Sequence, residues 1–244
     1  MDFREHESDF TEAHYAELLR LAKRRYRFAR FTDPHTDGDI LWRHDIDMSP
    51  HRARALARIE AAEGVAATYL VMLHSRFYNA LDGEVASVIR DIASLGHSIG
   101  LHFDPAFYAG RPDLDEFVAL EKQMLERALE VRVDVLSWHN PSIGNWLTLD
   151  EDRIVGMVNA YGKTIRDTFP YVSDSHGIWR FRRLHDVLAA GEEPRLHVLT
   201  HAEWWVPDAM PPRARISRAI EGRAAQVQRW YDDDLAALGR PNVR

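Results

Sequence analysis

The sequence predicts an α/β fold, and more specifically a distorted or incomplete (β/α) barrel, TIM-barrel-like, with about seven parallel strands. Apolar, strand-like runs alternate with helical segments, which is typical of a parallel sheet, and the length of 244 residues suits one such barrel. Four of the runs end in His or Asp just before a loop: ILWRHDID at 40–47, HSIGLHFDP from 97, VDVLSWHNP from 133 and HVLTHAEWW from 197. Because the carboxyl ends of parallel strands share one face, we expect these polar residues to meet around a single ion.

The composition excludes several classes of function. With 45% hydrophobic and 28% charged residues, the chain can bury one substantial core, so we expect a single domain over 1–244. The net charge of -7 is modest and the basic residues are scattered, which argues against nucleic acid as a partner. The chain has no cysteine, so disulfides, thiolate zinc sites and a cysteine nucleophile are excluded. A transition metal would need His and carboxylate ligands.

The sequence predicts no membrane-spanning segment. The charged start MDFREHESDF lacks the apolar core of a signal peptide, and the longest apolar stretch, at 64–73, is too short to cross a bilayer. We therefore expect a cytoplasmic protein without a transmembrane segment. Its oligomeric state does not follow from the sequence.

The amino-terminal part is expected to form one helix and then a βα unit. Apolar residues at helical spacing predict a helix over 12–28, packed beside the barrel, with Thr11 as its cap. After a turn-rich loop comes the strand ILWRHDID, and Ser49-Pro50 then opens a helix that Gly64 closes.

The same pattern then repeats along the chain. The later predicted elements are strands at 66–73, 97–103, 133–138 and 197–204 and helices at 83–95 and 114–129. Between 150 and 190, IVGMVNAYG and YVSDSHGIWRF favour short strands joined by irregular loops. The last segment predicts an Arg-rich amphipathic helix over 212–238 that packs on the barrel.

Two carboxylates end the first barrel strand. Asp45 and Asp47 should share one face, because side chains alternate along a strand. Such a pair repels itself unless a cation or a shared proton relieves the repulsion, and one carboxylate would bind metal while the other removes a proton from water. Arg43 and His44 flank the pair and are candidates for contacting the substrate or supporting the site. The alternative is a polar strand end in which Asp47 caps the helix near Pro50.

Two histidines at strand ends are candidate metal ligands. His102 follows an apolar run, with Asp104 two residues on and therefore expected on the same face. His139 ends VLSW and precedes Asn140, where the chain leaves the strand, so it would complete a metal site or orient a substrate. For His97, at the other end of its strand, we expect a structural role.

The last strand supplies further candidates. His201 ends HVLT, and Glu203 beyond it would support a catalytic group. Trp204 and Trp205 would form an aromatic wall for a sugar, or else pack in the core against the last helix. A polar cluster in YVSDSHGIWR is also expected to support the site; its members are Asp174, Ser175 and Arg180.

The order of these motifs resembles the polysaccharide deacetylase family over roughly residues 40–205, as a divergent RHDxD-type member with chitooligosaccharide-deacetylase homology. The resemblance implies a distorted barrel that removes N- or O-acetyl groups with a divalent metal. It implies that Asp45 is the catalytic base and Asp47 a metal ligand. GHSIGLH matches the segment of the metal histidines, with His102 as the first of the usual pair, and LTH matches the last motif, with His201 as catalytic acid.

Two positions depart from the family pattern. The second metal histidine, expected four residues after His102, falls on Ala106. The third protein ligand is therefore expected to be His139, with Asp104 or a neighbouring side chain as alternatives. WHNPSIG resembles the motif in which the family usually carries an Arg near the catalytic Asp, but here His139 holds the basic position.

The implied function is a metal-dependent, carbohydrate deacetylase-like hydrolase that acts on C–N (non-peptide) or ester bonds. We expect it to act in surface polysaccharide biosynthesis, of O-antigen or capsule, on an acetylated saccharide or a sugar-linked precursor. Zinc is the expected metal, with cobalt, nickel or manganese as alternatives. The metal would polarise an acetyl carbonyl and acidify water, Asp45 would take the proton of that water, and His201 would protonate the departing amine.

Two other hypotheses stay open. One keeps the metal but changes the substrate to a non-sugar amide or ester; a phosphate ranks last because no Gly-rich loop with Lys or Ser follows a strand. The other is a metal-free or catalytically degenerate barrel that binds a saccharide or a protein partner. The missing second histidine favours this hypothesis, and the retained pair Asp45 and Asp47 opposes it.

Overall fold

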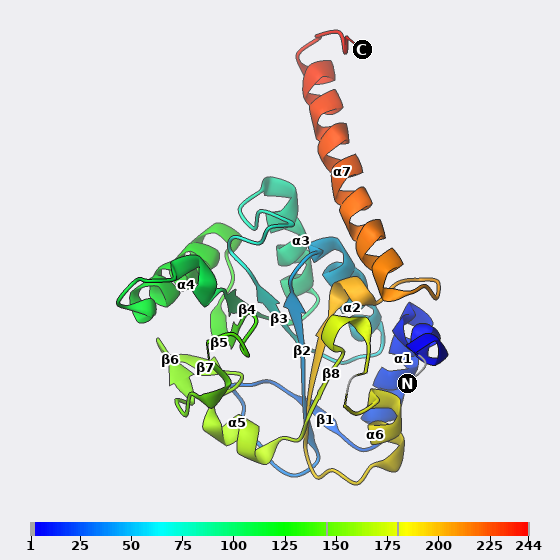
Figure 1. The fold of residues 1–244 in the computed structure, drawn as a ribbon, viewed down its shortest axis with the longest axis vertical. Helices are drawn as coiled ribbons and strands as arrows, with labels where there is room; N and C mark the ends of the chain where they lie inside the picture. The colour runs from blue at the N-terminus through cyan, green and yellow to red at the C-terminus, as the bar shows by residue number, and fades with distance from the viewer. Residues whose placement is uncertain (1–2, 145, 180, 244) are drawn as a thin grey trace.

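Nine strands form one sheet in the computed structural model, which describes residues 3–144, 146–179 and 181–243 (Figure 1). The strand order is β6-β7-β5-β4-β3-β2-β9-β8, and β1 pairs with the first part of β2. The strands are β1 Arg27–Ala29, β2 Asp39–Ile46, β3 Thr68–Val71, β4 Ser98–Phe103, β5 Val133–Trp138, β6 Arg153–Ile154, β7 Met157–Asn159, β8 Tyr171–Ser173 and β9 Leu196–His201. Only β6 and β7 pair antiparallel within these ranges. The predicted α/β class is confirmed, and in the described part of the chain no pairing joins β6 to β8, so the sheet is not closed.

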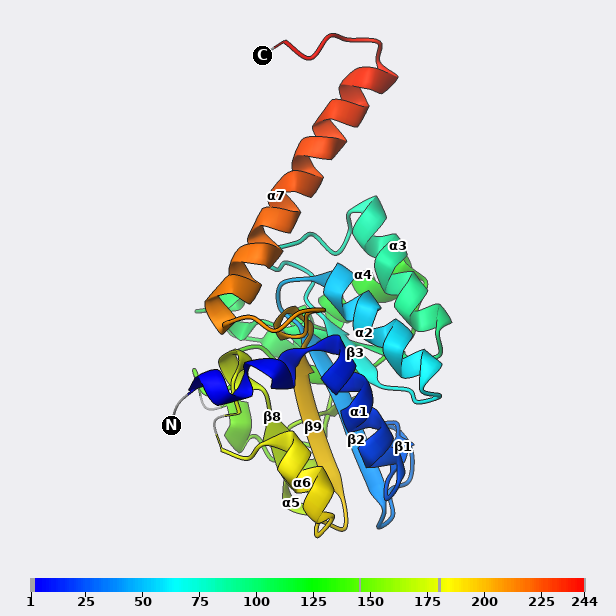
Figure 2. The same ribbon diagram turned by 90° about the vertical axis from the view of Figure 1, so that its right-hand side faces the viewer.

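Helices alternate with the strands and cover the outer side of the sheet. The α-helices are α1 Glu12–Lys23, α2 Pro50–Ala62, α3 Gly83–Ser94, α4 Leu114–Leu129, α5 Lys163–Thr168, α6 Leu184–Ala190 and α7 Pro212–Ala237. The 3-10 helices are η1 Phe3–Phe10, η2 Pro105–Tyr108, η3 Trp146–Thr148, η4 Ser175–Gly177 and η5 Ala202–Trp204. Along the outer side, α6, α1, α2, α3 and α4 each contact the next (Figure 2).

Apolar side chains fill both sides of the sheet, which explains why its strands are apolar runs. All eight residues of β2 are buried. A large cluster lies between the sheet and the outer helices, and a smaller one, which includes Leu41, Leu70 and Val135, lies on the inner side. Gly100 permits this packing, because a Cβ there would lie 2.7 Å from the carbonyl oxygen of Val135. Asp45 shares the inner side with Leu41 and lies nearer the carboxyl end of β2.

The first helix is shorter than the predicted 12–28. Thr11 caps α1 as predicted, with its hydroxyl 3.2 Å from the amide nitrogen of His14, but the helix ends at Lys23. Residues Arg27–Ala29 form β1 instead, because they pair with the start of β2. This tertiary pairing overrides the local helical spacing.

The last helix starts where it was predicted but does not pack on the body along its whole length. Arg215, near its start, is buried, whereas the outer turns extend away from the rest of the molecule (Figures 1 and 2). The expectation that the whole of 212–238 packs on the barrel is therefore wrong for its carboxyl-terminal part. No helix of the described residues combines the length and apolar character that a membrane crossing needs.

Candidate metal centre and active site

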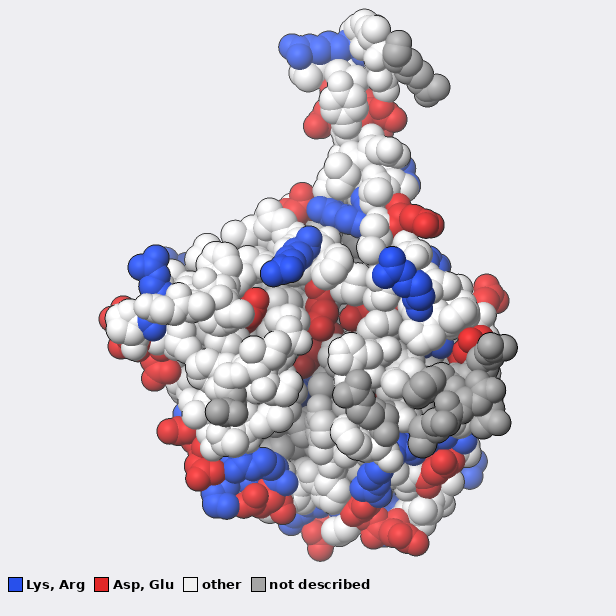
Figure 3. All heavy atoms as spheres, in the orientation of Figure 1, with Lys and Arg blue, Asp and Glu red and all other residues white. Residues whose placement is uncertain are grey.

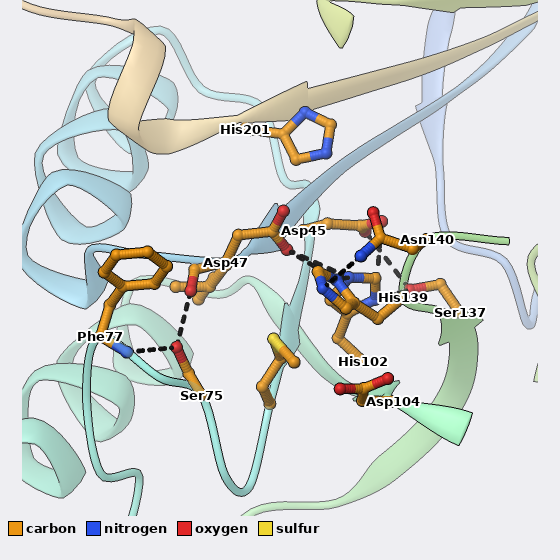
Figure 4. A network of polar contacts seen from close by, with 12 residues as sticks. Asp45, Asp47, Ser75, Phe77, His102, Asp104, Ser137, His139, Asn140 and His201 are labelled. Atoms are coloured by element: carbon orange, nitrogen blue, oxygen red, sulfur yellow. Dashed lines mark hydrogen bonds and ion pairs between the residues drawn. The ribbon is translucent and has the colours of Figure 1, made fainter. Parts of the chain in front are cut away.

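Three side chains from three segments converge at the carboxyl end of the sheet. Asp47 follows β2, His102 lies in β4 and His139 follows β5. Asp47 Oδ1 lies 3.1 Å from His102 Nε2 and 3.5 Å from His139 Nδ1, and the two ring nitrogens are 3.1 Å apart. One ligand atom from each residue therefore lies within 4.8 Å of the other two (Figure 4). These are the three side chains that the sequence predicted as metal ligands, and the structure brings them together.

The donor set fits a divalent cation. Asp47 Oδ1 is buried, and no hydrogen bond of normal geometry reaches it within the described residues. Its pKa is held far below the usual range, because the contacts with His102 and His139 outweigh the burial that would raise it. Two imidazoles and one carboxylate with converging ligand atoms are one of the ligand sets of catalytic zinc sites, which leave a position open for water or substrate.

The contacts of Ser137 orient His102 for this role. His102 and Ser137 are paired in register across β4 and β5, which places their side chains on one face. His102 Nδ1 lies 2.6 Å from Ser137 Oγ, and that hydroxyl donates to Asp45 Oδ1 at 3.4 Å. A hydroxyl that donates to Asp45 accepts from Nδ1–H of His102, so the lone pair of Nε2 points toward Asp47 and His139.

Asp45 lies beside the metal ligands but has different neighbours. Its Oδ2 is 3.6 Å from His102 Nδ1 and 3.5 Å from Nη2 of Arg43. Arg43 is buried, and its guanidinium lies 4.4 Å from the ring centre of Tyr161. Burial lowers the pKa of Arg43, but the charge of Asp45 raises it more, so this cation is permanent. Asp45 also lines the cleft, where it can accept a proton.

His201 stands across the cleft from His102 and His139 (Figure 4). It is paired in register with Asp45 across β9 and β2, so both side chains share a face. His201 Nδ1 lies 2.7 Å from Asp174 Oδ1, which leaves Nε2 for the cleft. Burial lowers the pKa of His201, but the charge of Asp174 and this contact raise it well above its usual value. The ring is therefore held as an imidazolium, the form that a general acid needs.

Glu203 adds an acidic group with unusual protonation. Only 3% of Glu203 is exposed, and the residue lines the same cleft. Burial and the nearby charge of Asp47 raise its pKa to about 8. At neutral pH its carboxyl group is therefore largely protonated and able to donate a hydrogen bond.

These groups line one cleft of about 460 Å³. Asn140 and Trp204 lie on its wall, and Asn140 Nδ2 is 2.9 Å from His139 Nε2. Tyr161, in the loop after β7, and Tyr171, in β8, also line it. The cleft thus has a polar floor and partly aromatic walls.

Three predicted site residues lie elsewhere. His44 is fully buried on the opposite face of β2, where it contacts Glu60, because side chains alternate along the strand. Asp104 caps η2 by accepting from the amide of Ala106 at 3.0 Å, and it does not line the cleft. Trp205 is buried in the core, so it forms no wall for a sugar. Arg180 lies outside the described residues.

The roles of some supporting residues differ from their sequence expectation. Ser49, not Asp47, caps α2, with its hydroxyl 3.3 Å from the amide nitrogen of Arg52. Trp205 donates its indole N–H to Asp174 at 3.0 Å and so helps to hold that carboxylate. Asp174 was predicted to support a catalytic group, and in the structure it contacts His201, the predicted catalytic acid.

Sequence reasoning missed Ser137 and Tyr161. Ser137 carries no motif of its own, although a serine two residues before His139 at the end of an apolar run was a usable signal. Tyr161 lies in the irregular region after β7, and only the tertiary structure brings it to Arg43.

Comparison with known proteins finds distant structural neighbours only. No protein-family model matches the chain, and no curated protein matches it. Among solved structures, a mutant of a CE4 family pseudoenzyme with restored enzymatic activity matches at 14% identity and a TM-score of 0.40, covering 77% of this chain and 62% of its own. A family 4 acetyl xylan esterase from Clostridium thermocellum, in complex with a cobalt ion, matches at 14% identity and a TM-score of 0.38, covering 83% and 92%.

A third solved structure, the Streptococcus pyogenes deacetylase PplD in complex with acetate, matches at 13% identity and a TM-score of 0.37, covering 84% of this chain and 85% of its own. At these identities and TM-scores we draw no function from the matches. The chain spans less than two thirds of the first of these structures. All three are named as family 4 proteins or as a deacetylase.

Proposed function

We propose that this protein is a metal-dependent hydrolase that removes the acetyl group from an N- or O-acetylated sugar. The observation that carries the proposal is one cleft in which Asp47, His102 and His139 converge, with Asp45 beside them and His201 across from them. A cation site flanked by one proton acceptor and one proton donor suits metal-assisted hydrolysis of an acyl group.

The chain's own residues account for the proton transfers. Asp47, His102 and His139 would hold the divalent ion, which when bound polarises a carbonyl and lowers the pKa of water. Asp45, which lies 3.5 Å from Arg43, accepts the proton of the water that attacks the acetyl carbon. As the bond from that carbon to the sugar nitrogen or oxygen breaks, His201 donates its proton to the departing atom. Asp174 holds the His201 ring in place during this transfer.

The cleft walls favour a saccharide substrate. Trp204, Tyr161 and Tyr171 line it, and aromatic rings offer an apolar face with a polar edge. Asn140 and the protonated Glu203 add hydrogen-bonding groups. We infer that the substrate is an acetylated saccharide or a sugar-linked precursor of a surface polysaccharide, such as O-antigen or capsule, met in the cytoplasm, and that the ion is zinc.

Metal content tests the proposal directly. Purified wild-type protein is expected to carry close to one equivalent of divalent metal, and Asp47→Ala and His102→Ala are expected to lose at least nine tenths of it. His185→Ala is the matched control, because that histidine is 43% exposed and lies outside the cleft, so its metal content should equal wild type. Elemental analysis by mass spectrometry provides the measurement.

The outcomes separate the competing hypotheses. Wild-type protein that binds no zinc, cobalt or nickel after incubation would overturn the hydrolase and favour a saccharide-binding protein. Metal binding with release of acetate from 4-nitrophenyl acetate, but from no acetylated saccharide, would point to a non-sugar ester or amide. Acetate release from an acetylated oligosaccharide, lost with the metal, would support the proposal.

A further inference from the structure

The outer part of α7 and the residue that caps its end present a row of exposed apolar side chains. Ile220, Val227, Tyr231 and Leu238 are 47%, 47%, 61% and 63% exposed. We call these four residues the outer stripe. They are seven, four and seven residues apart, which places them on one side of the helix. The spacing is therefore the same whether it is counted from Ile220 or from Leu238.

Contacts with the body use a different side of α7. Arg215 donates to the carbonyl oxygen of Gly177 at 3.1 Å, and Gln226 and Trp230 donate to Glu84 at 2.6 and 2.7 Å. A cavity of about 300 Å³ separates the first half of the helix from α2 and α3. The helix is therefore only loosely packed on its own chain (Figure 2).

Contact with a partner would stabilise the outer turns of α7. Isolated helices are marginally stable in water, and most helices are stabilised by burying an apolar face. Here the apolar face of the outer turns is open to solvent along the stripe. A continuous exposed row of this kind is typical of an interaction surface.

The charges of α7 indicate what the partner is. Residues 212–224 contain four arginines and one glutamate, whereas residues 225–237 contain one arginine and three consecutive aspartates. Asp233 and Asp234 also share a shallow depression with Asp82 and Glu84, which makes the outer half more acidic. Figure 3 shows basic side chains where the helix meets the body and acidic ones along its outer part.

We propose that α7 pairs antiparallel with the α7 of a second copy of this chain, stripe against stripe. A two-fold axis between Val227 and Tyr231 sets Ile220 against Leu238 of the second copy and Val227 against its Tyr231. Arg223 and Asp234 lie along the same edge of the stripe, so the axis also brings Arg223 near Asp234 of the second copy, twice in the dimer.

The same charges disfavour the other occupants. A parallel pair would set arginines against arginines and aspartates against aspartates. An anionic membrane surface would meet three aspartates beside the stripe, and acidic groups are repelled by anionic lipids. An antiparallel second copy is the arrangement in which every charged segment faces its opposite.

Self-association of the full chain tests the surface. Sedimentation velocity over a hundredfold range of concentration is expected to show a monomer–dimer equilibrium. The double variant Val227→Glu and Tyr231→Glu should raise the dissociation constant at least tenfold, with unchanged helix content by circular dichroism. Ala236→Glu, an exposed position on the other side of the same helix, is the matched control and should dimerise like wild type.

Charge reversal tests the pairing. Arg223→Asp alone and Asp234→Arg alone should each weaken the dimer at least tenfold, and an equimolar mixture should restore it as a heterodimer. Wild-type protein that stays monomeric at every concentration, including protein that instead binds phosphatidylglycerol vesicles, would overturn the proposal. So would a dimer that the stripe variants leave intact.

Orientation is read from cross-linking, because the chain has no cysteine of its own. A mixture of Ile220→Cys and Leu238→Cys chains should oxidise mainly to the mixed disulfide. Either chain alone should cross-link at least tenfold more slowly. Faster cross-linking of each chain with itself would show a parallel pair and reject the antiparallel arrangement.

Discussion

Two carboxylates that are two residues apart in the sequence receive different environments in the structure. Asp47 lies against His102 and His139, which hold its pKa far below the usual range. Asp45 lies against Arg43 and the Ser137 hydroxyl, within reach of the cleft. The neighbours of each carboxylate therefore separate a ligand from a proton acceptor.

Replacing Asp45 by Asn should separate metal binding from turnover. The amide keeps the size of the side chain and removes its basicity, so acetate release should fall about 10²- to 10⁴-fold, the usual contribution of a general base. Metal content should remain that of wild type. A variant that retains more than a tenth of the wild-type turnover would rule out Asp45 as the base.

Replacing Asp174 by Asn should move the pH profile. In the wild type the charge of Asp174 raises the pKa of His201, and without it burial, which lowers that pKa, prevails. His201 would then lose its proton at lower pH, so the alkaline limb of kcat/KM shifts to lower pH. Turnover above neutral pH should fall by about 10²-fold. An unshifted alkaline limb would show that His201 is not the acid.

At the scale of elements, the register of β2 and β9 sets the distance between Asp45 and His201, the proposed base and acid. Asp45 and His201 are paired residues of this ladder, and so are His44 and Thr200 on its other face. There, His44 Nδ1 lies 2.6 Å from the Thr200 hydroxyl, while His44 Nε2 lies 2.6 Å from the buried Glu60. His44 thus helps to fix the register from the side opposite the cleft.

Replacing Ser137 by Ala should weaken metal binding without removing a ligand. His102 would lose the hydroxyl that holds its Nδ1, and loss of such an orienting contact commonly costs about 10- to 100-fold in metal affinity. Zinc titration against a competing chelator provides the measurement. Ser142→Ala, in the same cleft but away from His102, is the control, and equal affinities in the two variants would contradict this role.

Periodicity predicted the long elements well, because their burial repeats along the chain. The ranges of α4 and β5 agree with the predictions at 114–129 and 133–138, and Gly83 opens α3. It failed at β1, whose three residues are strand only by pairing with β2. The residues of the site also divide into those that the sequence revealed and those that depend on tertiary packing. Strand-end residues such as Asp47, His102 and His139 were visible in the sequence, whereas the contact of His44 with Glu60 depends on the packing of α2 against the far face of β2.

At the scale of the whole molecule, the ion would join segments that are far apart in the chain. Asp47, His102 and His139 lie on three different strand ends. A ligand that binds only the folded state adds stability by mass action, about 2.7 kcal/mol at a concentration of 100 times Kd.

Chelation should therefore lower the melting temperature of the full chain. Calorimetry with EDTA and then with excess zinc should show a fall and a recovery of several degrees. The Asp47→Ala variant should melt at the same temperature in both conditions. A wild-type melting temperature that EDTA leaves unchanged would contradict stabilisation of the fold by the ion.

Because the sheet is open, its pairing does not hold all residues of the site equally firmly. Asp45 and His201 are joined by one continuous backbone ladder, whereas His139 follows β5, whose backbone pairing reaches β2 through β4 and β3. Spreading the sheet between β2 and β5 would withdraw His139 from Asp47 and stretch the hydrogen bond from Ser137 to Asp45, but it would leave Asp45 beside His201. Binding of a metal ion would then require only a short return of the β5 end.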